Sequence, residues 1–320
     1  MTKNKYFVFS DVHGEYMALI SALEEAGYNS NDPTHKLISL GDNFDRGPDS
    51  KSVWNYLRKN KAIMVKGNHE EMLEEALEKG IDGEFVLFNI LHNGLDATIQ
   101  SFSGHAIPAI ITPKEIDDLI QVITVTAGTY NGRSLLTTLK ELPLYYETAG
   151  HIFVHAGFEP VTPWQLSSKD VMLWDIEYSH LPIKSTDKVV FIGHHHAARV
   201  RKNAEEHGYA ELYLGYPSYG NRDENRPVRI NNKIAIDPCS SLTKKVNVVV
   251  VEDYPLEALA TTSNKEKEEE QDTVIDTITS GVYATYTTTN TDAFTIRMDN
   301  QYFRYDPNTV TVLRGDTRNR

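Results

Sequence analysis

Short apolar runs rich in β-branched and aromatic residues recur along the chain, and each ends at Gly, Asp, Asn or His. These runs predict strands, and they occupy residues 6–14, 36–42, 62–70, 151–157 and 188–196. The segments between them follow a helical period. In 15–28, for example, Met17, Ile20 and Leu23 are three positions apart and Gly27 suits a helix C-terminus. Strands that alternate with helices favour an α/β core.

The pattern changes further along the chain. From about residue 80 to 145 it predicts mostly helices, and two more apolar runs, 234–241 and 246–253, follow the last core strand. Residues 264–272, NKEKEEEQD, form a charge block of the kind that remains solvated as a linker. Beyond the block, period-two alternation predicts a few short strands. We therefore divide the chain into a main domain (1–255), an acidic linker (256–273) and a small β appendage (274–320).

Composition narrows the class of protein. A net charge of −13 argues against a broad surface for duplex nucleic acid, which needs clustered Lys and Arg. Cys239 is the only cysteine, so no intrachain disulfide can form. The longest aliphatic run, 246–251, is far shorter than the roughly 20 residues that span a bilayer, and no apolar signal core precedes residue 6. We expect a soluble, cytoplasmic protein.

The ends of the predicted strands carry residues that bind metal ions. The first run ends with Asp11 and His13, the second with Asp42, Asp45 and Arg46, the third with Asn68 and His69, the fourth with His155 and the fifth with His194. An α/β sheet gathers its ligands at these strand ends. Mixed carboxylate, imidazole and amide ligands suit Mn²⁺, Fe²⁺ or Zn²⁺, and a pair of such ions activates water and stabilises a phosphoryl transition state.

Five ordered motifs, SDVHG, GDNFDRG, GNHE, HAGF and GHHH, make the sequence resemble the calcineurin-like metallophosphoesterases. Within that family it is most similar to the serine/threonine phosphoprotein phosphatases and their compact bacterial and phage members. The connecting text HNGLDATIQSF and LKELPLYYE is similar too, and the resemblance covers about residues 4–254. It implies a metallophosphoesterase catalytic domain with an α/β (α+β) fold of four layers, a β-sandwich flanked by helices.

The resemblance also implies roles for the strand-end residues. Asp11 and His13 would hold a first metal ion, Asp42 would bridge two ions, and Asn68, His155 and His194 would hold the second. Asp45 and His69 match the family's acid pair, in which His69 protonates the leaving oxygen, and Arg46 would grip phosphate. A metal-bridging hydroxide would attack phosphorus in line. The implied cofactors are two divalent ions, Mn²⁺ first, with Fe²⁺, Zn²⁺ or Ni²⁺ as options.

Two departures from the family pattern weaken the substrate assignment. The family's Trp-x-Arg element reads LWDIEY here, so Ile176 stands where a phosphate-binding arginine is expected. Arg222 or Arg226 could replace it, or both could be solvent-exposed loop residues. The GHHH motif departs from Gly-His-Thr-Pro and matches Gly-His-x-His, which would make His196 a ligand of the first metal.

Three functions follow from these observations. The first is a dinuclear metal-dependent phosphomonoesterase that acts on phosphoserine, phosphothreonine or phosphotyrosine in proteins, with a phosphorylated protein or small phosphoester as substrate. The second is a nucleotide hydrolase acting on dinucleoside polyphosphates or phosphodiesters, which Ile176 and His196 favour. The third is a non-catalytic binding scaffold, against which the complete set of ligands counts. The sequence does not predict the oligomeric state.

Overall fold

The computed structural model describes residues 2–105, 107, 112–206, 225–256, 295–298 and 301–304. The chain divides into two compact units, residues 1–270 and 271–320. Most of the predicted acidic linker, 257–273, lies outside the described residues.

The first unit is built on two mixed sheets. The first sheet has the order β3-β2-β1-β9, with β1 (Asn4–Phe9), β2 (His35–Ser39) and β3 (Ile63–Met64) parallel and β9 (Val249–Asp253) antiparallel to β1. The second has the order β4-β5-β6-β8-β7, comprising β4 (Tyr145–Glu147), β5 (His151–Val154), β6 (Val189–Ile192), β8 (Lys233–Ala235) and β7 (Val228–Ile230). Strands β5, β6 and β8 are parallel, and β4 and β7 run antiparallel at the edges.

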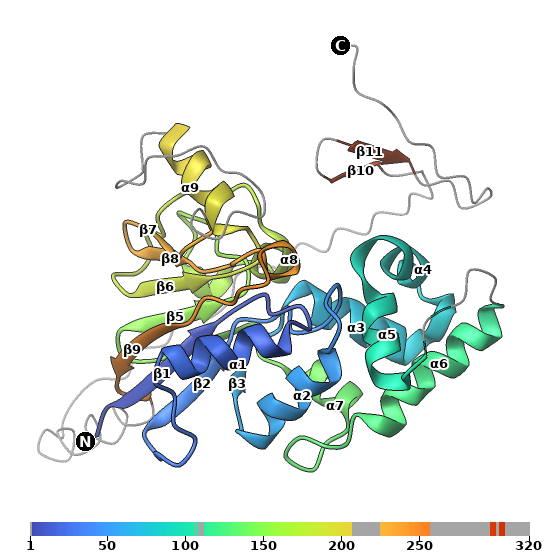
Figure 1. The fold of residues 1–320 in the computed structure, drawn as a ribbon. Coiled ribbons are helices and arrows are strands. Elements are labelled where there is room, and N and C mark those ends of the chain that lie inside the picture. The colour runs from blue at the N-terminus through green and yellow to red at the C-terminus, as the bar shows by residue number, and fades with distance from the viewer. Residues whose placement is uncertain are drawn as a thin grey trace, which may run out of the picture. The chain divides into compact units, whose positions relative to one another are not determined.

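Helices cover the outer face of each sheet. Beside the first sheet lie α1 (Tyr16–Glu25), α2 (Ser50–Lys59), α3 (Asn68–Lys79), α5 (Leu95–Ser103), α6 (Pro113–Thr126) and α7 (Leu135–Glu141), with the short η1 (Gly80–Asp82), α4 (Val86–Phe88) and the π-helix η2 (Asn89–Asn93) between them. Beside the second lie η3 (Trp164–Leu166), α8 (Lys169–Trp174) and α9 (Ala197–Glu206). The short α10 (Ser240–Thr243) precedes β9. Figure 1 shows α1 and α2 on one side of the sheets and α9 on the other.

The central strands are buried on both faces, which explains their nearly continuous apolar sequence. In β1, Tyr6 and Val8 face the second sheet, where the rings of Tyr6 and Phe153 lie 6.4 Å apart. Phe7 and Phe9 face the opposite way, into the core formed with the helices. Two sheets with helices outside both make four layers, so the predicted fold class is confirmed.

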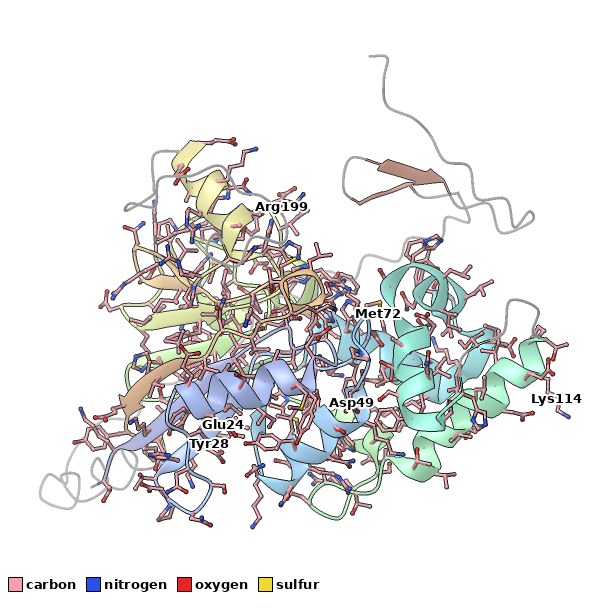
Figure 2. All side chains as sticks on the ribbon, in the orientation of Figure 1. Glu24, Tyr28, Asp49, Met72, Lys114 and Arg199 are labelled. Carbon is pink, nitrogen blue, oxygen red and sulfur yellow. The ribbon has the colours of Figure 1, made fainter. Side chains whose placement is uncertain are left out.

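Local sequence explains where the helices begin. Asp49 precedes α2, and its side chain accepts a hydrogen bond from the Ser52 backbone N–H at 3.1 Å (Figure 2). Thr112 and Glu115 form a capping box at the start of α6, where Pro113 occupies the first turn. The mostly helical character predicted for residues 80–145 is therefore present in α5, α6 and α7.

In the second unit, β10 (Thr295–Met298) and β11 (Gln301–Arg304) pair antiparallel, with Ile296 opposite Phe303. This pair lies within the predicted β appendage, and the other residues of that segment are outside the described part. Among the described helices of the whole chain, none has the length and apolar character that a membrane span requires.

Candidate metal centre

The candidate ligands lie just beyond the carboxyl ends of parallel strands. Asp11 follows β1, Asp42 follows β2 and Asn68 follows β3, all in the first sheet. His155 follows β5 and His194 follows β6, both in the second sheet. Backbone hydrogen bonds join neighbouring strand ends within each sheet, Asp11 N–H to the Gly41 carbonyl at 3.1 Å in the first and Gly193 N–H to the His155 carbonyl at 2.7 Å in the second. The centre therefore receives residues from both sheets.

Many residues of the centre have a positive φ, which is uncommon for residues other than glycine. Eleven non-glycine residues of the described chain have positive φ, and these six belong to the candidate site: Asp11, His13, Asp42, Asp45, Arg46 and His194. Each such residue costs on the order of 1 kcal/mol or more and persists only where surrounding contacts hold it. The strand ends therefore turn sharply and aim their side chains inward at a cost in stability.

Close packing requires glycine beside the first strand end. A Cβ on Gly193 would overlap both the Ser10 hydroxyl and the Asp11 carboxylate. The absence of a side chain lets the β6 end approach the β1 end, so that the His194 backbone N–H donates to Asp11 Oδ2 at 3.0 Å. The glycine of the GHHH motif thus brings the two sheets' ligands together.

The Asp42 carboxylate faces two groups of imidazoles. Its Oδ2 lies 3.7 Å from His13 Nε2, and its Oδ1 lies 3.4 Å from His155 Nε2. The ligand atoms of His13, Asp42 and His69 lie within 4.8 Å of one another, as do those of Asp42, His155 and His194. One carboxylate is therefore shared by two sets of potential metal ligands.

Asn68 completes the second set. Its Oδ1 lies 2.9 Å from His155 Nε2 and 3.1 Å from His194 Nδ1. An amide oxygen and two imidazole nitrogens that converge beside a carboxylate suit a borderline divalent ion.

Backbone carbonyls fix the tautomers of two imidazoles. A carbonyl oxygen only accepts, so His13 Nδ1 donates to the Phe44 carbonyl at 2.8 Å, and His155 Nδ1 donates to the Leu40 carbonyl at 2.8 Å. In each ring the remaining Nε2 then carries a lone pair directed toward Asp42. A metal-binding histidine is commonly held in this way by its other nitrogen.

The electrostatics of the cluster suit cations. Burial raises the pKa of Asp42 well above its ordinary value, and the charges of Asp11 and Glu70 raise it further. Burial, followed by the charge of Asp237, raises the pKa of Asp11 to about 7. Burial also lowers the pKa of His13 and of His194 well below 6.5, which keeps both imidazoles neutral. Crowded buried carboxyls and neutral imidazoles are a donor set that divalent ions stabilise, so these residues fit the implied metals.

An imidazole–carboxylate pair stands beside the candidate ligands. His69 Nδ1 lies 2.6 Å from Asp45 Oδ2, and both side chains are fully buried. The Arg46 guanidinium, which can only donate, lies 2.9 Å from His69 Nε2 and 3.0 Å from His13 Nε2. Burial, followed by the charge of Arg46, lowers the pKa of His69 well below 6.5. The predicted neighbours Asp45, Arg46 and His69 are thus brought together.

Glu70, next in the chain, holds the turn that carries Asp42. Its Oε2 accepts from the backbone N–H groups of Asp42 at 2.7 Å and Gly67 at 3.0 Å. Its Oε1 accepts from the backbone and side-chain amides of Asn43 at 2.9 and 3.0 Å. The sequence analysis did not single out Glu70, because these bonds join the ends of two different strands.

Asp237 was also missed. It follows β8 directly, is buried, and lies 4.0 Å from His196 Nε2 through its Oδ2. Burial raises the pKa of Asp237 to about 7. The signal was present in the sequence, since the apolar run at 234–236 ends at this aspartate just as the five recognised runs end at their ligands.

The structure says less about the two arginines that were considered for additional phosphate binding. Arg222 lies outside the described residues. Arg226 is exposed, and its carbonyl oxygen accepts from Arg201 Nη2 at 3.2 Å. Ile176 is 55% exposed, and the nearby Trp174 ring lies 6.3 Å from the His194 ring. The segment that lacks the expected arginine therefore does border the candidate site.

Comparison with known proteins places these features in a family. The model of the Calcineurin-like phosphoesterase family matches residues 5–216. Serine/threonine-protein phosphatase 2 of Escherichia coli (strain K12) is 44% identical over 81 residues, which cover 25% of this chain and 36% of that protein. The protein of the same name from Salmonella typhimurium is 32% identical over 118 residues, 37% of this chain and 52% of the relative. The matches thus span about half or less of these curated relatives.

A solved metallophosphoesterase from Sphaerobacter thermophilus has 15% sequence identity and a TM-score of 0.37, with 83% of this chain and 94% of that chain covered.

Proposed function

The chain belongs to the calcineurin-like phosphoesterase family, and on that premise we propose that it is a dinuclear metal-dependent phosphomonoesterase that acts on phosphorylated proteins. The observation that carries this proposal is the shared Asp42 carboxylate, which faces His13 through one oxygen and His155 through the other. The similarity to bacterial serine/threonine-protein phosphatases supports the substrate class.

Two divalent ions would be held by the strand-end residues, the first by Asp11, His13, Asp42 and His196 and the second by Asp42, Asn68, His155 and His194. When bound, such ions supply a water molecule of lowered pKa and neutralise charge on the phosphoryl oxygens. We propose Mn²⁺ as the native ion, since the ligands combine oxygen and imidazole donors without thiolate. We also propose that the protein works in the cytoplasm.

The remaining residues handle the phosphate and the proton. Arg46 reaches toward both His13 and His69, where its planar guanidinium can grip two phosphoryl oxygens. When Arg46 turns from His69 Nε2 to the phosphate, this nitrogen is free to take up a proton and to pass it to the leaving oxygen. Asp45 accepts from His69 Nδ1 at 2.6 Å, which orients the ring and stabilises its protonated form.

A second candidate function is hydrolysis of nucleotides, either dinucleoside polyphosphates or phosphodiesters. Ile176 favours it, because this exposed apolar residue stands in the sequence where a second phosphate-binding cation is expected, two positions after Trp174, whose ring lies 6.3 Å from the His194 ring. A substrate phosphate of lower charge requires fewer cationic donors.

A paired assay on Mn²⁺-reconstituted protein tests the proposal. One arm offers phosphopeptides and p-nitrophenyl phosphate, and the other offers diadenosine tetraphosphate and bis-p-nitrophenyl phosphate. We expect turnover in the first arm, lost in Asp42→Asn and retained in Asp32→Asn, a control that precedes β2 and so lies at the opposite end of that strand from Asp42. Preference for the second arm would support the nucleotide hydrolase. Absence of both turnover and bound metal would support a binding scaffold.

A further inference from the structure

Helix α5 supplies a hydroxyl to the proposed acid pair. We infer that Thr98 is a positioning residue that holds Asp45 in the orientation needed by His69; this inference rests on the proposed function. Thr98 is 53 positions from Asp45 in sequence, yet its Oγ1 lies 2.6 Å from Asp45 Oδ1 and 2.7 Å from the Asp45 backbone nitrogen. Both residues have no exposed surface.

The direction of each hydrogen bond follows from the chemistry of the groups. The Asp45 backbone N–H can only donate, so Thr98 Oγ1 accepts there. The single hydroxyl proton of Thr98 is then directed to Asp45 Oδ1. Ser50 Oγ lies 3.2 Å from Thr98 Oγ1 and supplies a second donor to it. One donor and two acceptor positions are the full capacity of a hydroxyl, and all three are used.

This arrangement determines how the Asp45 carboxylate meets His69. Since Oδ1 is held by Thr98, Oδ2 is the oxygen that faces His69 Nδ1 at 2.6 Å. The His69 ring is thereby fixed with Nε2 directed toward Arg46, at 2.9 Å from Nη2. Rotation of the Asp45 carboxylate would break its hydrogen bonds to Thr98 and to His69 at once.

Thr98 also holds the backbone of Asp45. The φ of Asp45 is 69° and that of Arg46 is 66°, both in the left-handed region that non-glycine residues rarely adopt. The Asp45 N–H is fixed by Thr98, and the Arg46 N–H donates to the Gly94 carbonyl at 3.1 Å. Gly94 precedes α5, so one helix and its entry turn restrain both strained residues.

The helix itself is firmly placed. Leu95, Ile99 and Phe102 belong to the core that α5 shares with the first sheet and its other helices. The predicted helical segment at 80–145 thus contributes to catalysis through α5, by fixing the acid pair rather than by contacting substrate.

The test measures how activity depends on the leaving group. Aryl phosphates with poor leaving groups need a proton from the general acid, whereas 2,4-dinitrophenyl phosphate does not. In Thr98→Val we expect kcat for phenyl phosphate to fall by about 30-fold or more, kcat for 2,4-dinitrophenyl phosphate to change by less than about threefold, and metal content to be unchanged. Thr98→Ser should restore the wild-type dependence.

Thr138 offers a matched control. It is buried in α7, and its hydroxyl donates to the Ser134 carbonyl one turn earlier, so Thr138→Val removes an equivalent group that makes no hydrogen bond to the acid pair. A loss in Thr98→Val that is equal for all leaving groups, or that Thr138→Val reproduces, would overturn the positioning role.

A second measurement is independent of turnover. Nitrogen NMR of labelled protein, with the His69 signals assigned by His69→Asn, reports which ring nitrogen carries the proton. We expect a single Nδ1–H tautomer in the wild type and a mixture in Thr98→Val. An identical single tautomer in both proteins would overturn the inference even if no aryl phosphate is hydrolysed. Failure of hydrolysis with two ions bound would instead overturn the proposed function.

Discussion

The indole Nε1 of Trp174 donates to Glu71 Oε2 at 3.1 Å and so joins the end of α8 to the first turn of α3. Glu71 also pairs with Lys169, so the segment that leads to Ile176 is fixed beside the residues of the GNHE motif. The position where an arginine is expected is therefore close to the site in space, although its side chain is apolar.

Restoring a cation at this position should strengthen phosphomonoester binding. In Ile176→Arg we expect kcat/KM for p-nitrophenyl phosphate to rise about tenfold, the effect of one modest charge-assisted hydrogen bond. Bis-p-nitrophenyl phosphate, with a single charge, should gain less. Leu166→Arg is the control, since it adds the same charge at another exposed position. Equal increases in kcat/KM in the two arginine variants would show that the added net charge, rather than its position, causes the effect.

Glu70→Gln should weaken both the fold and the metal centre. The carboxylate accepts four N–H donors, and the glutamine amide would direct its own hydrogens at some of them. We expect the free energy of unfolding to fall by about 2–4 kcal/mol and Mn²⁺ affinity to fall by about 10- to 100-fold. Urea unfolding and metal titration measure these quantities. Glu78→Gln, at an exposed carboxylate paired with Lys140, should change neither.

The two adjacent histidines of the GHHH motif can be distinguished by metal content. His196→Ala is expected to retain one of two Mn²⁺ ions after gel filtration, because we predict that His196 binds the first ion. His195→Ala, its neighbour in the chain, should retain both. Elemental analysis gives the stoichiometry, and two tightly held ions in His196→Ala would remove that residue from the ligand set.

Stability without metal should depend on pH in a defined direction. Burial raises the pKa of Asp45 and of Asp237 to about 7, above the 3.8 of an ordinary aspartate. The folded chain therefore holds protons that the unfolded chain has released, and stability falls as the pH rises through 7. Below pH 6.5 the buried imidazoles act oppositely, because burial lowers the pKa of His13 and of His69 and only the unfolded chain takes up their protons.

We therefore expect the free energy of unfolding in EDTA to fall as the pH rises from 6.5 to 7, by up to about 1.4 kcal/mol per pH unit for each unbalanced proton, and to level off by pH 8, where the folded Asp45 and Asp237 have also lost their protons. The slope should become flatter below pH 6.5. Urea titrations across pH 5.5 to 8.5 measure it, and Asp45→Asn should reduce the slope. A rise in stability from pH 6.5 to 8 would contradict the prediction.

We further propose that the main domain works alone. All described ligand candidates precede residue 240, and a chain that ends at residue 262 keeps every element through β9. This truncated chain is expected to retain the metal content and kcat of the full chain. A loss of either would assign a catalytic or stabilising role to the acidic linker or the β appendage.

The strand ends could be predicted from the sequence because each has a local pattern, an apolar run followed by a residue of a type that binds metal. Asp42 and His155 were recognised in this way, and the structure brings them within 3.4 Å. Thr98 and Glu70 could not be recognised, because the bond from Thr98 to Asp45 spans 53 positions and that from Asn43 to Glu70 spans 27, and both depend on how the chain packs. Asp237 was overlooked although its local pattern is the same.

The two sheets contribute ligands to the same centre, and this has a mechanical consequence. Asp42 and Asn68 extend from one sheet and His155 and His194 from the other, so ions held between them would cross-link the layers of the sandwich. The free energy of metal binding would then also stabilise the packing of the two sheets against each other. A substitution in the interface between the sheets, for instance at Phe153 where it packs against Tyr6, would therefore lower the affinity for the metal ions before the protein unfolds.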